Sequence, residues 1–382
     1  MPWKESSMYE QRLAAVHRVL LLKQPVAQVA REFGVSRKTL YKWLKRHERR
    51  EPFALHDRSR RPQHSRGKTD DTIELAVVEV RRRYNWGPRK IRRVLLDRPL
   101  AGVPSVRTVA NILDRRGCLL LKQTSPPAAP PQSFARGAPN ELWQVDHKGP
   151  IEVARQKVMP LAVIDDHSRY CLSFTAVSDL TMQTAWNVLW DLFGEVGVPE
   201  SILCDNAFGG AHHTAGLSWF DAQLVRLGIK PVHGRPYHPQ TQGKVERFNG
   251  TVDRELIDFD ARRDSVEHFA ADSERYRMTY NTIRPHEALD DLPPIVFWKP
   301  SSRVRPATLP QVSYPADAVT RRVSHGGDVR YRNARILLGR GLAGQTVRIE
   351  QREREAAVYY SWKLLRVIPL DQLGGPHSDK MV

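Results

Sequence analysis

The run Leu142-Trp-Gln-Val-Asp146 is a short, largely apolar stretch that ends in an acid, which indicates a β-strand. Two more runs of strand character follow, Val158 to Ile164 and Tyr170 to Val177. The residues between them, Asp165-Asp-His-Ser168, favour a tight turn, because Asp and Ser side chains bond to nearby backbone N–H groups. This region therefore predicts a β-hairpin beside a third strand.

Helices then alternate with strands along the chain. Ala185 to Val196 has a long apolar face, Glu200 to Cys204 is a fourth strand, and Trp219 to Leu227 and Gly243 to Phe259 are further helices. Strands alternating with helices predict an α/β domain with a mixed sheet. We place this domain at residues 140–300.

The N-terminus has the pattern of a helix-turn-helix. Helices are expected at residues 10–23, 26–33 and 37–46, with Gly34 able to end the second and Ser36 to cap the third. The third helix of such a unit lies in the major groove of DNA with its first residues at the base edges. An ordinary helical hairpin with a charged face is the alternative. The residues expected to contact bases are Arg37, Lys38, Thr39, Tyr41 and Lys42.

The remaining boundaries follow from composition. A second helical unit is expected at 69–121, where Pro88 opens one helix and Ser105 caps another, and it resembles a second helix-turn-helix or winged domain. The last region alternates short β-rich runs with Gly and Arg, which favours a small antiparallel barrel. The predicted divisions are 1–55, a basic linker at 56–68, 69–121, a Pro-rich linker at 122–139, 140–300 and 301–382.

The net charge of the 382-residue chain is +18, and its placement is uneven. Residues 1–125 hold 29 Lys and Arg against 12 Asp and Glu, whereas the remaining 257 residues hold 31 against 30. This asymmetry indicates a polyanion partner for the first third, most simply DNA, and a solubilising basic arm is the other interpretation.

The cellular compartment is predicted from membrane-spanning runs, secretory signals and cysteine spacing. No apolar run approaches the ~18 residues that span a bilayer, and the first residues do not form a secretory signal. Three widely spaced cysteines fit a reducing compartment. We expect a cytoplasmic protein with no membrane partner.

Three acids occupy informative places in the α/β domain. Asp146 and Asp205 end the first and fourth strands, and Glu246 lies early on the helix that begins near Gly243. Strand ends and a helix N-terminus can converge at one point, where three carboxylates would suit Mg²⁺ or Mn²⁺. By spacing alone, ordinary surface carboxylates remain the favoured interpretation, because three acids in an α/β domain are common.

The segments around these acids resemble the integrase-core transposases of bacterial insertion sequences, which are relatives of retroviral integrase with a ribonuclease-H-like fold. Those segments are Leu142-Trp-Gln-Val-Asp146, Val163-Ile-Asp-Asp-His-Ser-Arg-Tyr170, Asp205-Asn206 and His238-Pro-Gln-Thr-Gln-Gly-Lys-Val-Glu-Arg-Phe-Asn249. Similarity extends to the family's N-terminal DNA-binding part and to the segment after its catalytic helix, in Asp57-Arg-Ser-Arg-Arg-Pro62, Trp86-Gly-Pro-Arg-Lys-Ile91 and Tyr280-Asn-Thr-Ile-Arg-Pro-His-Glu-Ala-Leu289.

The resemblance implies a multidomain α+β protein with helix-turn-helix units, a ribonuclease-H-like catalytic core and a small C-terminal β-barrel. It implies that Asp146, Asp205 and Glu246 hold two Mg²⁺ ions, for which Mn²⁺ substitutes, and that a DNA 3′-hydroxyl carries out strand transfer. The expected partners are double-stranded DNA of the element ends and the target, and further copies of the chain, since two ends must be joined. We also expect contacts with DNA from Arg89, Lys90, Lys244 and Arg247.

The sequence departs from the family pattern at Asn206-Ala207, where the family has Asn-Gly, and at Pro294-Ile295, where it has Pro-Ala. Other metal ligands are conceivable, but His212-His213 reads as a polar loop and Asp165-Asp166 as a hairpin cap. Two other classes of function stay open: a DNA-binding repressor derived from a transposase without catalysis, and a nuclease acting on RNA–DNA hybrids.

Overall fold

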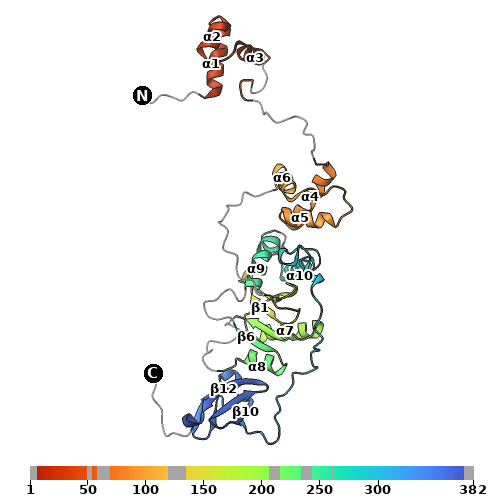
Figure 1. The fold of residues 1–382 in the computed structure, drawn as a ribbon, viewed down its shortest axis with the longest axis vertical. Helices are drawn as coiled ribbons and strands as arrows, with labels where there is room; N and C mark the ends of the chain where they lie inside the picture. Colours follow the sequence, from red (N-terminus) through yellow and green to blue (C-terminus); the bar gives the residue numbers. More distant parts are fainter. Residues whose placement is uncertain are drawn as a thin grey trace, which may run out of the picture. The chain divides into compact units, whose positions relative to one another are not determined.

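The computed structural model describes residues 7–49, 54–57, 69–118, 135–205, 216–233, 243–259 and 261–373. The chain divides into two compact units, Met1–Lys68 and Thr69–Val382, which are described separately here. Figure 1 labels the helices and strands of both units. No helix in the described part of the chain is both long and apolar enough to cross a membrane.

The first unit is the expected helical bundle. Its helices are α1 (Met8–Leu20), α2 (Val26–Glu32) and α3 (Arg37–Glu48), packed around buried Val16, Val29 and Leu40, among others. Ser36 caps α3, since its hydroxyl accepts a hydrogen bond of 3.1 Å from the Thr39 N–H. Gly34 has a φ of +64°, the left-handed conformation that lets the chain turn between α2 and α3.

The second unit begins with three more helices, α4 (Asp71–Tyr84), α5 (Pro88–Leu96) and α6 (Val106–Arg115). They share a core that includes Val77, Ile91 and Ile112. Pro88 stands in the first turn of α5 and Ser105 caps α6, both as the sequence predicts. We call residues 69–118 the second helical module.

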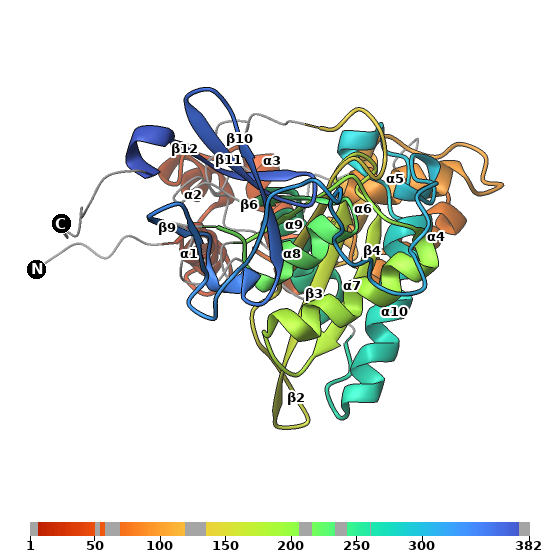
Figure 2. The same cartoon turned by 90° about the horizontal axis from the view of Figure 1, so that it is seen from below.

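A mixed six-stranded sheet follows, with the path β2-β3-β1-β5-β6 and with β4 beside β3. β1 pairs in parallel with β5 and β5 with β6, whereas β3 is antiparallel to β1, β2 and β4. β2 and the start of β3 form a hairpin that projects from the sheet (Figure 2). The strands are β1 (Trp143–His147), β2 (Ile151–Val153), β3 (Gln156–Asp165), β4 (Cys171–Val177), β5 (Ser201–Cys204) and β6 (Lys230–His233).

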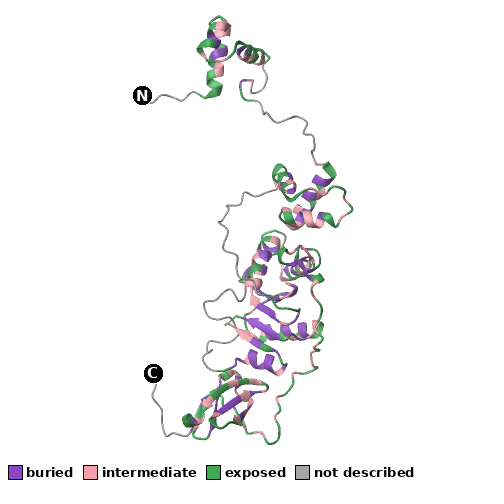
Figure 3. Ribbon diagram, viewed as in Figure 1, coloured by how far each residue is buried: buried purple, intermediate pink, exposed green. Residues whose placement is uncertain are grey.

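Helices cover both faces of this sheet, and buried residues gather on the strands between them (Figure 3). Along β3, Leu161 and Val163 pack with α7 (Met182–Val196) and α8 (Trp219–Arg226). Ala162 and Ile164, which point to the opposite face, pack with the elements that follow β6. Those elements are α9 (Gly243–Val252), the π-helical turn η3 (Asp253–Ile257) and α10 (Val266–Thr282).

The C-terminal part is a second sheet, with antiparallel order β12-β11-β10-β7, and a separate hairpin of β8 and β9. A closed barrel was expected, but none is found in the described residues, because β8 and β9 pair with each other and leave β7 and β12 as edges. This sheet packs on α8 through Ala222 and Val225. The strands are β7 (Thr320–Arg322), β8 (Asp328–Tyr331), β9 (Ala334–Leu337), β10 (Thr346–Gln351), β11 (Glu355–Tyr360) and β12 (Lys363–Pro369).

Candidate active site

Strand pairing brings two of the three predicted acids to the same end of the sheet. β1 and β5 run in parallel with Val145 opposite Cys204, so Asp146 and Asp205 occupy the next position along each strand. Because parallel strands point the same way, both carboxylates lie at the same end of the sheet. Asp205 is exposed, whereas Asp146 is half-buried.

α9 brings the third acid to the same place. Its Asn249 side chain donates a hydrogen bond of 2.9 Å to Asp146 Oδ2. Glu246 lies one turn earlier on the same face of α9, since residues three apart on a helix are neighbours. The start of α9 is held by Gln144, whose Oε1 accepts a hydrogen bond of 3.2 Å from the Val245 N–H.

Gln144 and Asn249 are site residues that the sequence reasoning did not single out. Gln144 stands two residues before Asp146, so both side chains point to the α9 face of the sheet. Asn249 stands three residues after Glu246. These spacings are the signal by which both residues could have been found.

The pKa of Asp146 depends on its burial and on the two acids near it. Burial, together with the negative charges of Asp205 and Glu246, raises the pKa of Asp146 to about 6. Hydrogen bonds from Asn249 and from the His147 backbone act in the opposite direction. The charges of Asp205 and Glu246 therefore act on the Asp146 carboxylate and disfavour its ionised form.

The donor set fits a hard divalent cation. Carboxylate oxygens are the ligands that Mg²⁺ prefers, and a cation would relieve the repulsion felt at Asp146. Within the ranges that the structure describes, however, no three His, Cys, Asp or Glu side chains are grouped closely enough to hold a metal ion. The segments 206–215 and 234–242, with His212 and His213, lie outside those ranges.

Asp166, a further acid near Asp146, is bound by Gln144 and Lys244. Its Oδ1 accepts a hydrogen bond of 2.8 Å from Gln144, and its Oδ2 lies 2.6 Å from the Lys244 ammonium. Asp165 caps the hairpin turn as expected, by accepting hydrogen bonds from Ser168. Asp166 thus fixes the beginning of α9 to the sheet.

This pairing changes the interpretation of Lys244. The sequence predicts a contact with DNA phosphate, but the side chain is only 13% exposed, and burial lowers its pKa to about 8. Its cationic group is paired with Asp166 at 2.6 Å, and its contact with DNA phosphate stays a prediction. Arg247, one turn further round the helix, has an exposed side chain, and its contact with DNA stays a prediction.

Arg89 and Lys90, whose contact with DNA also stays a prediction, have ion-pair partners within the chain. Arg89 pairs with Glu287 at 2.6 Å and with Asp291 at 2.9 Å, and Lys90 pairs with Glu255 at 2.7 Å. Their partners are acids of the sheet domain. The segment expected to contact DNA therefore holds the second helical module on that domain.

The residues of the first unit that are predicted to contact bases lie on α3, in its first turns. Arg37, Lys38, Tyr41 and Lys42 are exposed on α3, with Tyr41 59% exposed. Thr39 is half-buried, and its hydroxyl lies 2.9 Å from that of Ser36. Four of the five side chains are accessible to a partner.

Comparison with protein families agrees with this architecture. Residues 136–239 and 227–294 match two models described as integrase core domain. The chain carries an integrase core domain. Residues 9–54 and 39–113 match models described as homeodomain-like domain, so helix-turn-helix modules precede the integrase core.

Curated relatives are retroviral polyproteins. The chain is 32% identical over 109 residues to the Gag-Pro-Pol polyprotein of Simian retrovirus SRV-1, and 30% identical over 118 residues to that of mouse mammary tumor virus strain BR6. These matches cover 28% and 31% of this chain. The chain spans about 6% of the length of these polyproteins.

Solved structures of integrases are also similar. The HTLV-2 integrase catalytic core domain in complex with magnesium, in its trimeric form, is 18% identical, with a TM-score of 0.34, over 42% of this chain and 97% of that one. The simian T-cell lymphotropic virus intasome in complex with PP2A regulatory subunit B56 gamma is 18% identical, with a TM-score of 0.37, over 81% and 99%.

Proposed function

We propose that this protein is a DNA transposase that binds the ends of an insertion sequence and cuts and joins DNA by metal-dependent phosphoryl transfer. The integrase core domain supports a DNA integration function of the transposase and integrase type. The observation that carries the finer proposal is geometric: the parallel pairing of β1 with β5 places Asp146 and Asp205 at the same end of the sheet, and Asn249, one turn after Glu246 on α9, donates a hydrogen bond to Asp146.

In this proposal Asp146, Asp205 and Glu246 hold two Mg²⁺ ions. Ions so held supply charge stabilisation to the attacking and leaving oxygens of an in-line displacement at phosphorus. The chain's own part is to position the ligands. Asn249 orients the Asp146 carboxylate, and Gln144 fixes the start of the helix that carries Glu246.

The test is a set of near-isosteric variants, Asp146→Asn, Asp205→Asn and Glu246→Gln. Each removes a negative ligand but keeps the side-chain shape, so each should bind DNA like the parent and lose joining by orders of magnitude. Ca²⁺ should support binding but little joining, and Mn²⁺ should replace Mg²⁺. Near-parental joining by any one variant would remove that residue from the ligand set.

The same assay addresses a repressor without catalysis. Such a protein would bind the element ends sequence-specifically in every variant and show no joining even in the parent.

We further propose that joining requires a multimer, because two ends must meet while one site serves one end. Sedimentation with end DNA should show more than one chain, and joining by a single chain on a single end would contradict this.

A further inference from the structure

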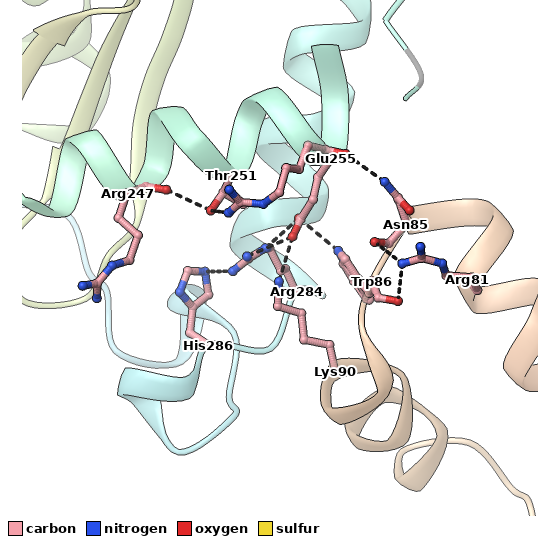
Figure 4. A network of polar contacts seen from close by, with 10 residues as sticks. Arg81, Asn85, Trp86, Lys90, Arg247, Thr251, Glu255, Arg284 and His286 are labelled. Atoms are coloured by element: carbon pink, nitrogen blue, oxygen red, sulfur yellow. Dashed lines mark hydrogen bonds and ion pairs between the residues drawn. The ribbon is translucent and has the colours of Figure 1, made fainter. Parts of the chain in front are cut away.

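The second helical module is fastened to the integrase core by one buried carboxylate, Glu255 of η3. Its Oε1 accepts hydrogen bonds from Lys90 at 2.7 Å and from Arg284 at 3.0 Å. Its Oε2 accepts from the Trp86 indole at 3.0 Å and from Arg284 at 2.7 Å. Figure 4 shows these donors reaching Glu255 from the module on one side and the core on the other.

A cleft of about 430 Å³ opens beside this junction. One wall is the end of α4, and the other is the middle of α10. Since α4 belongs to the second helical module and α10 to the core, the cleft exists only while the two are joined. Its polar lining includes Arg82, Arg83, Arg275, Tyr276, Glu255 and Arg284.

The cleft is positively charged once its ion pairs are taken into account. Of its two acids, Glu255 is bound by Lys90 and Arg284, and Asp272 is bound by Arg262 at 2.8 Å and by Arg275 at 2.7 Å. Each acid is therefore matched by two cationic groups.

Two further arginines add to this excess. Arg82 and Arg83, both exposed, form no ion pair with any residue that the structure describes. The guanidinium of Arg83 lies over the Tyr84 ring, 5.3 Å from its centroid. The lining is thus left with an excess of cationic groups that have room to bind an anion.

The buried hydroxyl of Tyr276 also indicates an anionic ligand with hydrogen-bond acceptors. Tyr276 is 8% exposed and lines the cleft, yet its hydroxyl has no hydrogen-bond partner in the described part of the chain. Buried polar groups without a partner are rare, and each needs a physical explanation. Burial raises the pKa of this phenol, so at neutral pH it keeps its proton and can donate to an acceptor oxygen.

We propose that this cleft binds the phosphodiester backbone of a DNA strand, with Arg82, Arg83, Arg275 and Tyr276 in its lining. The partner class rests on the proposed function, because DNA is the polyanion that a transposase handles. Guanidinium groups suit phosphate oxygens, since their N–H groups form paired, charge-assisted hydrogen bonds. A strand bound here touches the second helical module and the core together, which would hold the two in place.

The experiment measures binding of the full chain to a short DNA duplex of random sequence, with Ca²⁺ in place of Mg²⁺, over a series of salt concentrations. The double variant Arg82→Ala/Arg83→Ala should lower the slope of log affinity against log salt by ~0.9 for each phosphate that the variant no longer neutralises. The matched control is Arg155→Ala/Lys157→Ala, which removes the same charge from the exposed turn of the β2–β3 hairpin.

A second variant, Tyr276→Phe, removes only the partnerless hydroxyl, so thermal stability should be unchanged while affinity for the duplex falls several-fold. Slopes and affinities that match the control for both cleft variants would overturn the proposal. Stabilisation of the parent by inorganic phosphate, lost in the arginine variant while duplex binding is unaltered, would identify a site for small anions and also overturn it.

The cleft proposal and the transposase proposal can fail independently of each other. A parent that joins DNA in Mg²⁺ while both cleft variants bind like the control refutes the cleft alone. A parent that binds DNA through the cleft but never joins it refutes the transposase and leaves the cleft.

Discussion

Replacing Asp146 by Asn should stabilise the metal-free protein, which is the opposite of the usual effect of changing a buried polar residue. The folded-state pKa of Asp146 is about 6, against an ordinary value of 3.8. The folded chain therefore binds a proton more tightly than the unfolded chain, and stability falls as the pH rises from about 4 to about 6. Above that range the ionised carboxylate costs roughly 3 kcal/mol, which the neutral amide would relieve.

The assay is urea unfolding of parent and Asp146→Asn at several pH values, without divalent metal. The variant should be more stable by up to about 3 kcal/mol at pH 8, and the difference should vanish below about pH 4. Mg²⁺ should stabilise the parent more than the variant, because a ligand that binds only the folded state shifts the equilibrium toward it. A variant that is less stable than the parent at pH 8 would refute the raised pKa of Asp146.

Asp272 supplies a control of opposite sign. Its side chain is fully buried, and hydrogen bonds from Arg262 hold its pKa well below the usual range. Such a group stabilises the fold above its unfolded-state pKa and loses that contribution as the pH falls. Asp272→Asn should therefore destabilise the protein at pH 8 by about 1.5–3 kcal/mol, the range for hydrogen bonds to a charged group, because both arginine partners are half exposed.

Two other predictions concern the two helical modules that precede the sheet domain. Glu255→Gln should lower the free energy of unfolding by about 3–5 kcal/mol because it leaves two cations facing a neutral group, whereas Lys90→Met should lower it by only about 1.5–3 kcal/mol because Glu255 keeps Arg284. Urea unfolding distinguishes these, and equal losses would contradict the network. Arg37→Ala with Lys42→Ala should weaken binding to element-end DNA by about 1–3 kcal/mol for each base that is no longer contacted, and should relax sequence preference. Anisotropy titrations against a panel of duplexes would measure both, and unaltered affinity and preference would exclude α3 as the recognition helix.

The parts of the fold that sequence predicts well are those fixed by local chemistry. Ser36 and Ser105 cap helices where predicted, because a hydroxyl just before an apolar-periodic run satisfies the N–H groups that a helix leaves unpaired. The strands ending near Asp146 and Asp205 have the expected bounds to within a residue or two. β6, only four residues long and beginning Lys230-Pro231, has too short an apolar pattern to be recognised.

The choice of long-range partner could not be predicted from the sequence. Arg89 and Lys90 are two cations in a basic segment, and nothing near them in the chain shows that Glu255, Glu287 and Asp291 will face them. Lys244 is the same case on a smaller scale, since its partner Asp166 lies in a hairpin 78 residues earlier. A cation beside a predicted site is thus ambiguous between a ligand contact and an internal ion pair until the fold is known.

In the candidate site, repulsion between carboxylates is opposed by polar contacts that hold α9 on the sheet. Mutual repulsion favours moving Glu246 away from Asp146, and α9 could swing outward to do so. Three contacts oppose that motion: Lys244 with Asp166, the Val245 N–H with Gln144, and Asn249 with Asp146. Two of them hold the first turn of α9 and the third lies on the next turn, so the helix keeps its acid near the sheet without a cation. The contacts therefore fix the helix that carries Glu246 against the sheet, although within the described residues the three carboxylates are not grouped closely enough to hold an ion.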